Sequence, residues 1–264
     1  MTTNVEIRWA RGDDAEGIAG AIRSGFDPVL LDLMIYGSPA VARFICEQVA
    51  ARELGADSAY SVADAGEGAV GCAEVRRLPD GLFLNYIGVL PEARSLGLGR
   101  ALFLHALRSA ERGDAGRISL DVLDQNLAAR DWYARLGFQP GETTDWWEVP
   151  LSQAVGPPAA MIMGYPQAQV CQERFGFSQF TVVTPSGTHA VGRLGSNWFR
   201  LTRPEALTDP DLGAALLRID PGRRILALLR RGILPAALEG RVRLWASTVR
   251  LAAGIEEVIR RLGG

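Results

Sequence analysis

The feature that most constrains the fold is a run of strand character that leads through a glycine-containing loop into a helix. Residues 82–89 are dense in Leu, Phe, Tyr, Ile and Val, which predicts a strand buried on both faces. The loop reads Arg94-Ser95-Leu96-Gly97-Leu98-Gly99-Arg100, and residues 99–112 then have helical spacing. Residues 117–123 are predicted to form the next strand. This order of strand, loop, helix and strand predicts a mixed α/β sheet in the first part of the chain.

The loop has the chemistry of an anion site. A loop that opens a helix gathers main-chain N–H groups around one point, where the helix dipole is positive. Gly97 and Gly99 lack a Cβ, so phosphate oxygens can approach the backbone, while Arg94 and Arg100 add positive charge. The motif is therefore consistent with a pyrophosphate site. The alternative interpretation is a solvated turn whose glycines cap a helix.

The elements around the loop follow from turn and capping signals. Hairpins precede the loop, and a second helix-forming stretch follows it, capped by Asn126 and ended by Gly137. The expected elements are strands at 5–9, 59–63 and 69–76, helices at 15–22, 38–54 and 126–136, and an edge strand at 143–151.

Two motifs within residues 82–138 resemble the GNAT family of N-acetyltransferases. The first runs from Tyr86 to Leu102 and is similar to the family's strand, proline and Arg-x-x-Gly-x-Gly signature. The second is Asn126-Leu-Ala-Ala-Arg-Asp-Trp-Tyr133-Ala-Arg-Leu-Gly137-Phe138. Residues 5–9 with Asp13-Asp14 also resemble the family's opening, so the resemblance covers residues 1–150. It implies a mixed α+β acyl-CoA N-acyltransferase fold for this part of the chain.

The resemblance also implies roles for individual residues. Tyr133 would be the general acid that protonates the departing thiolate, a task that suits a phenol protonated at neutral pH. Asn126 would hold the pantetheine arm of acetyl-CoA. A packed aromatic on an amphipathic helix remains the structural alternative for Tyr133. The other implied coenzyme contacts are the backbones of Ile87, Gly88 and Val89 along the arm, and of Ser95, Leu96, Gly97, Leu98, Gly99 and Arg100 around the pyrophosphate, with Arg94 beside them.

The expected general base is the clearest departure from the family pattern. Many family members use a Glu on the strand before the phosphate loop, whereas this strand offers only Asn85, which cannot take up a proton. Glu74 on the neighbouring strand is the best substitute, against the alternative of a solvated strand carboxylate. Glu92 follows Pro91 beside the phosphates, and an acceptor amine of low pKa would need only water.

The second half of the chain predicts a smaller α+β domain. Strands are expected at 180–183, 189–194, 197–201 and 224–229, with helices at 211–217 and 245–262. The predicted organisation is an acetyltransferase domain at 1–152, a linker at 153–165 and an accessory domain at 166–264. Prolines and acids replace the phosphate-binding glycines after residue 201, so one hypothesis is a degenerate GNAT-like domain without a coenzyme site, which packs on the first domain and shapes its substrate cleft or a homodimer. The alternative is an unrelated accessory domain.

Composition narrows the classes of partner. Residues 1–150 carry 14 Arg against 22 acidic residues and residues 151–264 carry 14 against 8, with no Lys in the chain. The basic half lacks the aromatic interleaving that stacks on bases, so we expect no nucleic-acid partner. No apolar run suits a membrane span, and no secretory leader is evident, so we expect a cytoplasmic protein.

Cysteine and histidine chemistry are both unpromising from the sequence. Cys46, Cys72 and Cys171 are widely spaced in apolar surroundings, which favours reduced core thiols over a disulfide framework or a metal site. His105 and His189 lack acidic or Cys neighbours at ligand spacing. We therefore expect no metal cofactor and no imidazole catalysis.

The predicted function is transfer of an acetyl group from acetyl-CoA to a primary amine, on a small molecule or peptide, by direct attack in a ternary complex. The sequence offers no convincing covalent relay. The alternative is a coenzyme A-binding regulatory or interaction protein with a catalytically impaired domain. Aromatic side chains that either line an acceptor pocket or belong to the core are Phe26, Tyr36, Trp146 and Trp147.

Overall fold

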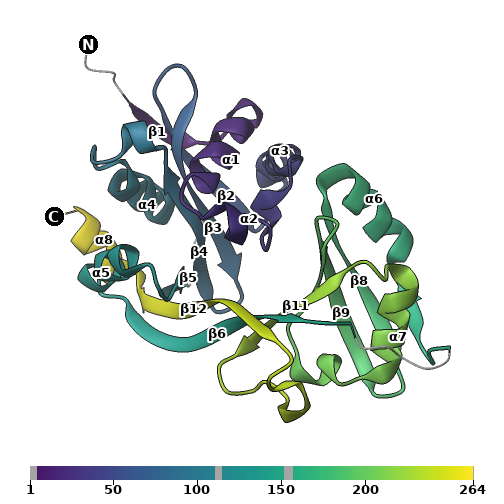
Figure 1. Cartoon of the computed structure of the whole chain (residues 1–264). Coiled ribbons are helices and arrows are strands. Elements are labelled where there is room, and N and C mark those ends of the chain that lie inside the picture. The colour runs from purple at the N-terminus through teal and green to yellow at the C-terminus, as the bar shows by residue number, and fades with distance from the viewer. Residues whose placement is uncertain (1–4, 111–114, 152–156, 264) are drawn as a thin grey trace. The chain divides into compact units, whose positions relative to one another are not determined.

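The computed structural model describes residues 5–110, 115–151 and 157–263. These residues form two compact units, each assembled from separate stretches of the chain (Figure 1). The first unit comprises Met1–Pro28, Val41–Gly141 and Val249–Gly264, and the second comprises Val29–Ala40 and Glu142–Thr248. Both units combine helices with a β-sheet, so the predicted α+β class is confirmed.

The first unit is a sheet with helices on both faces. Its strands lie in the order β1-β2-β3-β4-β5-β12, and β4 and β5 run parallel with α4 between them in sequence. The sequence-based strands and helices of residues 5–136 are confirmed in their order, except that the second helix begins at Val41. The helix expected at 99–112 ends at Ser109, and residues 111 and 112 lie outside the described residues. The elements are β1 (Glu6–Trp9), α1 (Ala15–Arg23), α3 (Val41–Ala51), β2 (Ser58–Asp64), β3 (Ala69–Leu78), β4 (Gly81–Val89), α4 (Leu98–Ser109), β5 (Arg117–Leu123), α5 (Leu127–Arg135), α8 (Ile255–Gly263) and the end of β12 (Arg243–Gly254).

Strand β3 shows which helices cover which face. Ala73 and Val75 belong to the apolar core that α4 also lines, whereas the Cys72 thiol lies 3.8 Å from the carbonyl oxygen of Ile18 in α1. Since side chains alternate along a strand, Glu74 lies on the same face of β3 as Cys72, the face that α1 covers. Glu74 therefore points to the α1 side of the sheet.

The second unit repeats the same order of elements in a smaller form. Its strands lie in the order β12-β6-β11-β10-β9-β8-β7, and β10 runs parallel to β11 with α7 between them in sequence. A separate apolar core joins these strands to α6 and α7. The elements are α2 (Pro28–Leu31), β6 (Gln139–Val149), β7 (Met161–Met163), α6 (Tyr165–Phe175), β8 (Phe177–Thr184), β9 (Gly187–Leu194), β10 (Trp198–Leu201), α7 (Pro210–Ile219), β11 (Arg224–Arg230) and the beginning of β12.

Two expectations for the last strands are wrong. The stretch predicted as one helix at 245–262 is strand β12 as far as Gly254 and helix α8 only from Ile255. Its alternating Val249, Leu251 and Ala253 are buried, because pairing within a sheet outweighs the local helical pattern. The stretch predicted as an edge strand, β6, lies between β12 and β11 in the sheet and pairs with β11 from Thr144 to Val149, so it is an interior strand.

The cysteines differ from one another more than the sequence suggests. All three are free thiols, and Cys72 is buried as expected. Cys46 and Cys171 are exposed, so the prediction that they are core thiols is wrong. Both lie on amphipathic helices, where one apolar neighbour in sequence says little about which face a residue occupies.

The described residues also bear on membrane and metal binding. Within residues 5–110, 115–151 and 157–263, no helix has the length and apolar character needed to cross a bilayer. The same ranges bring together no group of three or more His, Cys, Asp or Glu side chains that could hold a metal ion.

A buried polar cluster fastens the hairpin of β8 and β9 to the start of α7. Asp209 accepts hydrogen bonds through Oδ1 from the N–H groups of Asp211 and Leu212, at 2.9 and 3.1 Å. Its Oδ2 accepts from Thr184 at 2.6 Å and from Ser186, and it lies 2.8 Å from His189 Nε2. Burial opposes ionisation of Asp209, but the hydrogen bonds outweigh it and lower its pKa to about 2.

The Asp209 cluster predicts a pH dependence of stability. The folded-state pKa lies below the usual 3.8, so the stabilisation is complete above about pH 4 and is lost as the pH falls towards 2. The shift corresponds to about 2 kcal/mol. We expect urea unfolding of Asp209→Asn to lose this part of the pH dependence, while Glu205→Gln, an exposed carboxylate of the same unit, retains it. Identical pH slopes for wild type and Asp209→Asn would contradict the assignment.

Candidate active site

Strands β4 and β5 separate at the centre of the first unit. Their parallel pairing covers only Leu82–Leu84 on β4, opposite Ile118–Leu120 on β5. On its other edge β4 stays paired with β3 as far as Val89. Beyond Leu84, therefore, one edge of β4 has no strand partner among the described residues, so main-chain groups on that edge are available to a ligand, although the Val89 carbonyl oxygen already accepts a hydrogen bond from Arg94.

A β-bulge marks the point of separation. Glu74 lies opposite Tyr86 and Val75 opposite Leu84, so Asn85 is an extra residue on β4. A bulge increases the local twist and bends the strand. The bend at Asn85 explains why β4 leaves β5 immediately after Leu84.

The predicted coenzyme strand residues follow the bulge. Ile87, Gly88 and Val89 pair with β3 opposite Ala73, Cys72 and Gly71. A Cβ on Gly88 would lie 2.6 Å from the carbonyl oxygen of Ala21 in α1, so only glycine fits. The close approach of α1 thus fixes the position of this strand edge.

The loop after β4 presents unpaired main-chain donors. Ser95 and Gly97 have left-handed backbones, with φ of 67° and 75°, and Gly97 is the N-cap of α4. Within the described residues, the N–H groups of residues 95–99 have no hydrogen-bond acceptor. A Cβ at Gly97 or Gly99 would meet nothing within 4 Å, so the space above them is open. Consecutive free N–H groups at a helix N-terminus form an anion-binding concavity.

The two arginines of the loop have structural partners. Arg94 donates to the carbonyl oxygens of Val89 and Ser24, each at 3.0 Å, and Arg100 donates through Nε to that of Leu262 at 2.7 Å. Arg94 therefore ties the loop to β4 and α1, and Arg100 ties it to α8. Both cations stay beside the loop, but each is already hydrogen-bonded to the main chain.

Helix α5 carries the second predicted motif. Asn126 is exposed and accepts a hydrogen bond from the N–H of Ala129 at 3.2 Å, which confirms the predicted N-cap. Gly137 ends the helix with φ of 94°, also as predicted. Leu96 in the loop is 67% exposed, whereas Leu98 is 8% exposed and packs into the core.

Tyr133 is a core aromatic with a free hydroxyl. Its ring packs edge to face on Phe138, with 5.5 Å between centroids, and its residue surface is 6% exposed. No hydrogen bond to its hydroxyl is formed within the described ranges. Burial raises the pKa of Tyr133 far above its usual value, so the phenol is a hydrogen-bond donor throughout the physiological range.

Glu74 is buried rather than solvated. Its side chain has 0% exposure. It accepts hydrogen bonds from Arg76 Nε and from Asn85 Nδ2, each at 2.8 Å. The solvated strand carboxylate that the sequence left open is therefore wrong. A carboxylate on β3 and the bulge residue of β4 are joined on the α1 side of the sheet.

Sequence reasoning missed the part that Arg76 and Asn85 play beside Glu74. Arg76 stands two residues from Glu74 on the same face of β3, a spacing that the sequence displays. Asn85 could be placed only after the bulge was known.

The four aromatic residues considered for an acceptor pocket have different surroundings. Phe26 packs edge to face on Tyr86, with 6.2 Å between ring centroids, and Tyr36 is fully buried. The Trp146 indole donates a hydrogen bond to Thr248, and Trp147 packs against the core of the second unit.

The second unit lacks the corresponding features. Strand β10 ends at Leu201, and its register with β11 covers the strand from Trp198 to Leu201, so it has no separated portion. At the start of α7, the N–H groups of Asp211 and Leu212 both donate hydrogen bonds to the Asp209 carboxylate. A carboxylate of the chain itself thus occupies the place where an external anion would bind.

Comparisons with known proteins agree with this geometry. Residues 35–138 match the model of the acetyltransferase (GNAT) family. A 5-NmdU N-acetyltransferase of Pseudomonas phage PaMx11 is 44% identical over 55 residues, which are 21% of this chain and 37% of that protein. A putative [ribosomal protein bS18]-alanine N-acetyltransferase of Bacillus subtilis (strain 168) is 38% identical over 58 residues, 22% of this chain and 38% of that protein. The matched residues thus span a little over a third of each relative.

The fold comparison covers nearly the whole chain. A tandem GNAT protein from the clavulanic acid biosynthesis pathway superposes with a TM-score of 0.62 at 12% identity, over 96% of this chain and 99% of that one. At this identity the likeness concerns the fold alone, and it includes both units. The family match thus assigns residues 35–138 to a GNAT acetyltransferase domain, and the shared fold gives the chain a tandem GNAT-like architecture.

Proposed function

We propose that this protein transfers the acetyl group of acetyl-CoA to a primary amine by direct attack in a ternary complex. The observation that carries the proposal is the free N–H loop of residues 95–99 directly after a strand that has separated from its neighbour. Such a loop suits a pyrophosphate, and the free edge of β4 suits the amide groups of a pantetheine arm. The two curated relatives are both named N-acetyltransferases, which favours an amine acceptor.

In this mechanism the coenzyme is held by backbone rather than by charged side chains. The pyrophosphate would accept hydrogen bonds from residues 95–100, with Arg94 and Arg100 fixing the loop that presents them. The arm would pair with Ile87, Gly88 and Val89 along β4, and Asn126 would contact it from the start of α5. The thioester then lies in the gap between β4 and β5.

The chemical step needs one proton acceptor and one proton donor. The amine nitrogen attacks the thioester carbonyl carbon, and the tetrahedral intermediate collapses with cleavage of the C–S bond. We assign Tyr133 as the donor that protonates the leaving thiolate and Glu74 as the group that takes the amine proton, through water because its side chain is buried. Arg76 and Asn85 hold the Glu74 carboxylate in place.

A second function stands beside this one. Glu74 is fully buried and ion-paired, which favours a coenzyme A-binding regulatory protein with impaired turnover. A thiol-release assay with a panel of small amines and peptide N-termini distinguishes the two. We expect acetyl-CoA-dependent thiol release with at least one amine, and an acetylated product by mass spectrometry. Tight coenzyme binding by calorimetry with no turnover across the panel would support the regulatory function instead.

Substituting Tyr133 tests the proton donor. Tyr133→Phe keeps the ring that packs on Phe138 but removes the hydroxyl, so the fold should be intact. We expect kcat to fall about 10²-fold, because thiolate expulsion loses its general acid. Coenzyme A affinity should stay nearly constant. Full activity in Tyr133→Phe would remove this residue from the mechanism.

Substituting Glu74 tests the proton acceptor. Glu74→Gln preserves side-chain volume but cannot take up a proton, so we expect kcat to fall about 10²-fold while coenzyme A affinity stays nearly constant. The exposed Glu142→Gln, whose wild-type side chain is 70% exposed, is the matched control. A Glu74→Gln variant whose kcat, coenzyme A affinity and thermal unfolding temperature all fall together would assign Glu74 a structural role, and wild-type kcat would remove it from the mechanism.

A further inference from the structure

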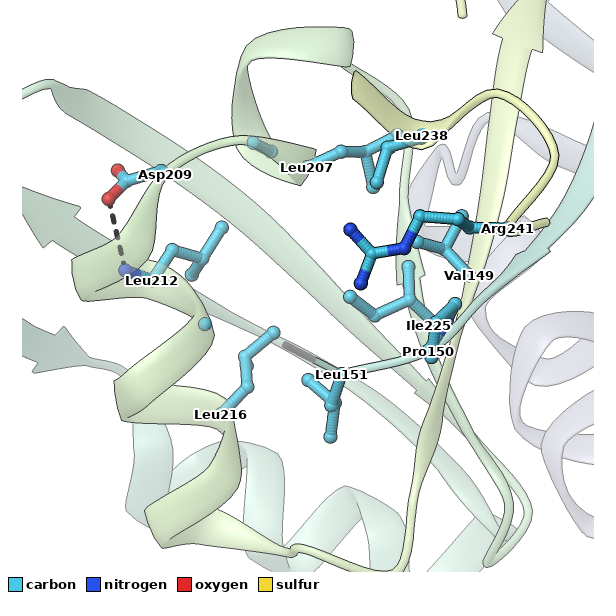
Figure 2. Close-up of a pocket in the computed structure, with 12 residues that line it drawn as sticks. Val149, Pro150, Leu151, Leu207, Asp209, Leu212, Leu216, Ile225, Leu238 and Arg241 are labelled. Atoms are coloured by element: carbon cyan, nitrogen blue, oxygen red, sulfur yellow. Dashed lines mark hydrogen bonds between the residues drawn. The ribbon is translucent and has the colours of Figure 1, made fainter. Parts of the chain in front are cut away.

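The second unit contains a cavity that the acetyl-transfer site does not use. It has a volume of about 410 Å³ and lies between α7, strand β11 and the segment that follows β6 (Figure 2). Its size falls in the range of pockets for small organic molecules. Most of its wall is aliphatic, from side chains that include Val149, Leu151, Leu207, Leu212, Leu216 and Ile225.

The cavity has a structural cause in the connection after β11. In the first unit, β5 leads into the nine-residue helix α5, whose Trp132 packs on Phe103 of α4 with 6.1 Å between ring centroids. In the second unit, β11 leads only to a single 3-10 turn, Ala236–Leu238. Among the described residues, therefore, no helix after β11 covers the side of α7 that corresponds to the covered side of α4, and the cavity remains.

One cation reaches into this apolar space. Figure 2 shows the guanidinium of Arg241 directed among the side chains of Leu207 and Ile225. Within the described ranges its side chain has neither a hydrogen bond nor an ion pair. A guanidinium beside aliphatic walls is matched by a carboxylate that carries an apolar body.

The acidic residue in the wall does not neutralise this cation. Both oxygens of Asp209 accept hydrogen bonds from the start of α7 and from the cluster with Thr184 and His189. Its charge is thus compensated inside the fold. Arg241 remains the group available for a ligand.

We propose that this cavity binds a small apolar carboxylic acid, with the carboxylate on Arg241 and the hydrocarbon body among the leucines of α7 and its neighbours. The site lies wholly within the second unit and does not depend on acetyl transfer. It assigns the second unit a ligand of its own in place of a coenzyme.

Calorimetric titration of the full chain with sodium decanoate tests the proposal. We expect saturable binding of decanoate, binding of decan-1-ol at least about tenfold weaker, and none of acetate, because the site needs both the charge and the apolar body. Absence of saturable decanoate binding, or equal affinity for decan-1-ol, would overturn the proposal.

Three variants locate the site. Arg241→Gln should weaken decanoate binding at least about tenfold and leave decan-1-ol binding unchanged. Arg203→Gln, an exposed arginine of the same unit outside the cavity wall, should bind as wild type does. Leu207→Trp should fill the cavity and abolish binding of both ligands. Wild-type affinity in both Arg241→Gln and Leu207→Trp, with thermal unfolding confirming that each variant is folded, would refute the assignment.

Discussion

The proposed acetyl-CoA site depends on main-chain N–H groups that the fold leaves without acceptors, within the described ranges, at the start of α4. Left-handed backbones at Ser95 and Gly97 turn the loop so that the N–H groups of residues 95–99 lack acceptors within the described ranges. Helix termini normally find a side-chain cap, and this one has none. Arg94 and Arg100 hold the loop open through bonds to main-chain carbonyls. An anion is the natural complement of that arrangement.

The two units show how one helix terminus can be kept for a ligand or closed by the chain. In the first, the bulge at Asn85 separates β4 from β5 and leaves a strand edge beside the free donors. In the second, β10 ends without separating from β11, and Asp209 supplies the anion internally. The hypothesis of a GNAT-like second unit without a coenzyme site has a physical basis here, because the Asp209 carboxylate takes the helix N–H groups that a phosphate would need. The isolated cation Arg241 then belongs to a different kind of site.

Much of the first unit could be predicted because its signals are local. Alternation in the strands, the cap at Asn126 and the left-handed Gly137 each depend on a few neighbouring residues. The prediction of a helix at 245–262 failed because β12 is set by strand pairing with segments far away in sequence. The contact between His189 and Asp209, 2.8 Å long, was invisible for the same reason, since twenty residues separate them. Each of the two units is built from separate stretches of the chain, and this arrangement depends on pairing between distant segments that the composition of a linker does not indicate.

The sequence by itself determined the class of fold, and it located the loop that we propose binds the pyrophosphate and the residues that we propose for proton transfer. These follow from residue types at fixed spacing, and such spacing acts through backbone geometry within a few residues. Only the tertiary structure decided that Glu74 is buried against Arg76 and Asn85. It also decided that the buried Tyr133 hydroxyl has no hydrogen-bond partner among the described residues and that a cavity remains beside α7. Burial and cavities depend on which distant segments pack together, and that outcome is a property of the whole chain.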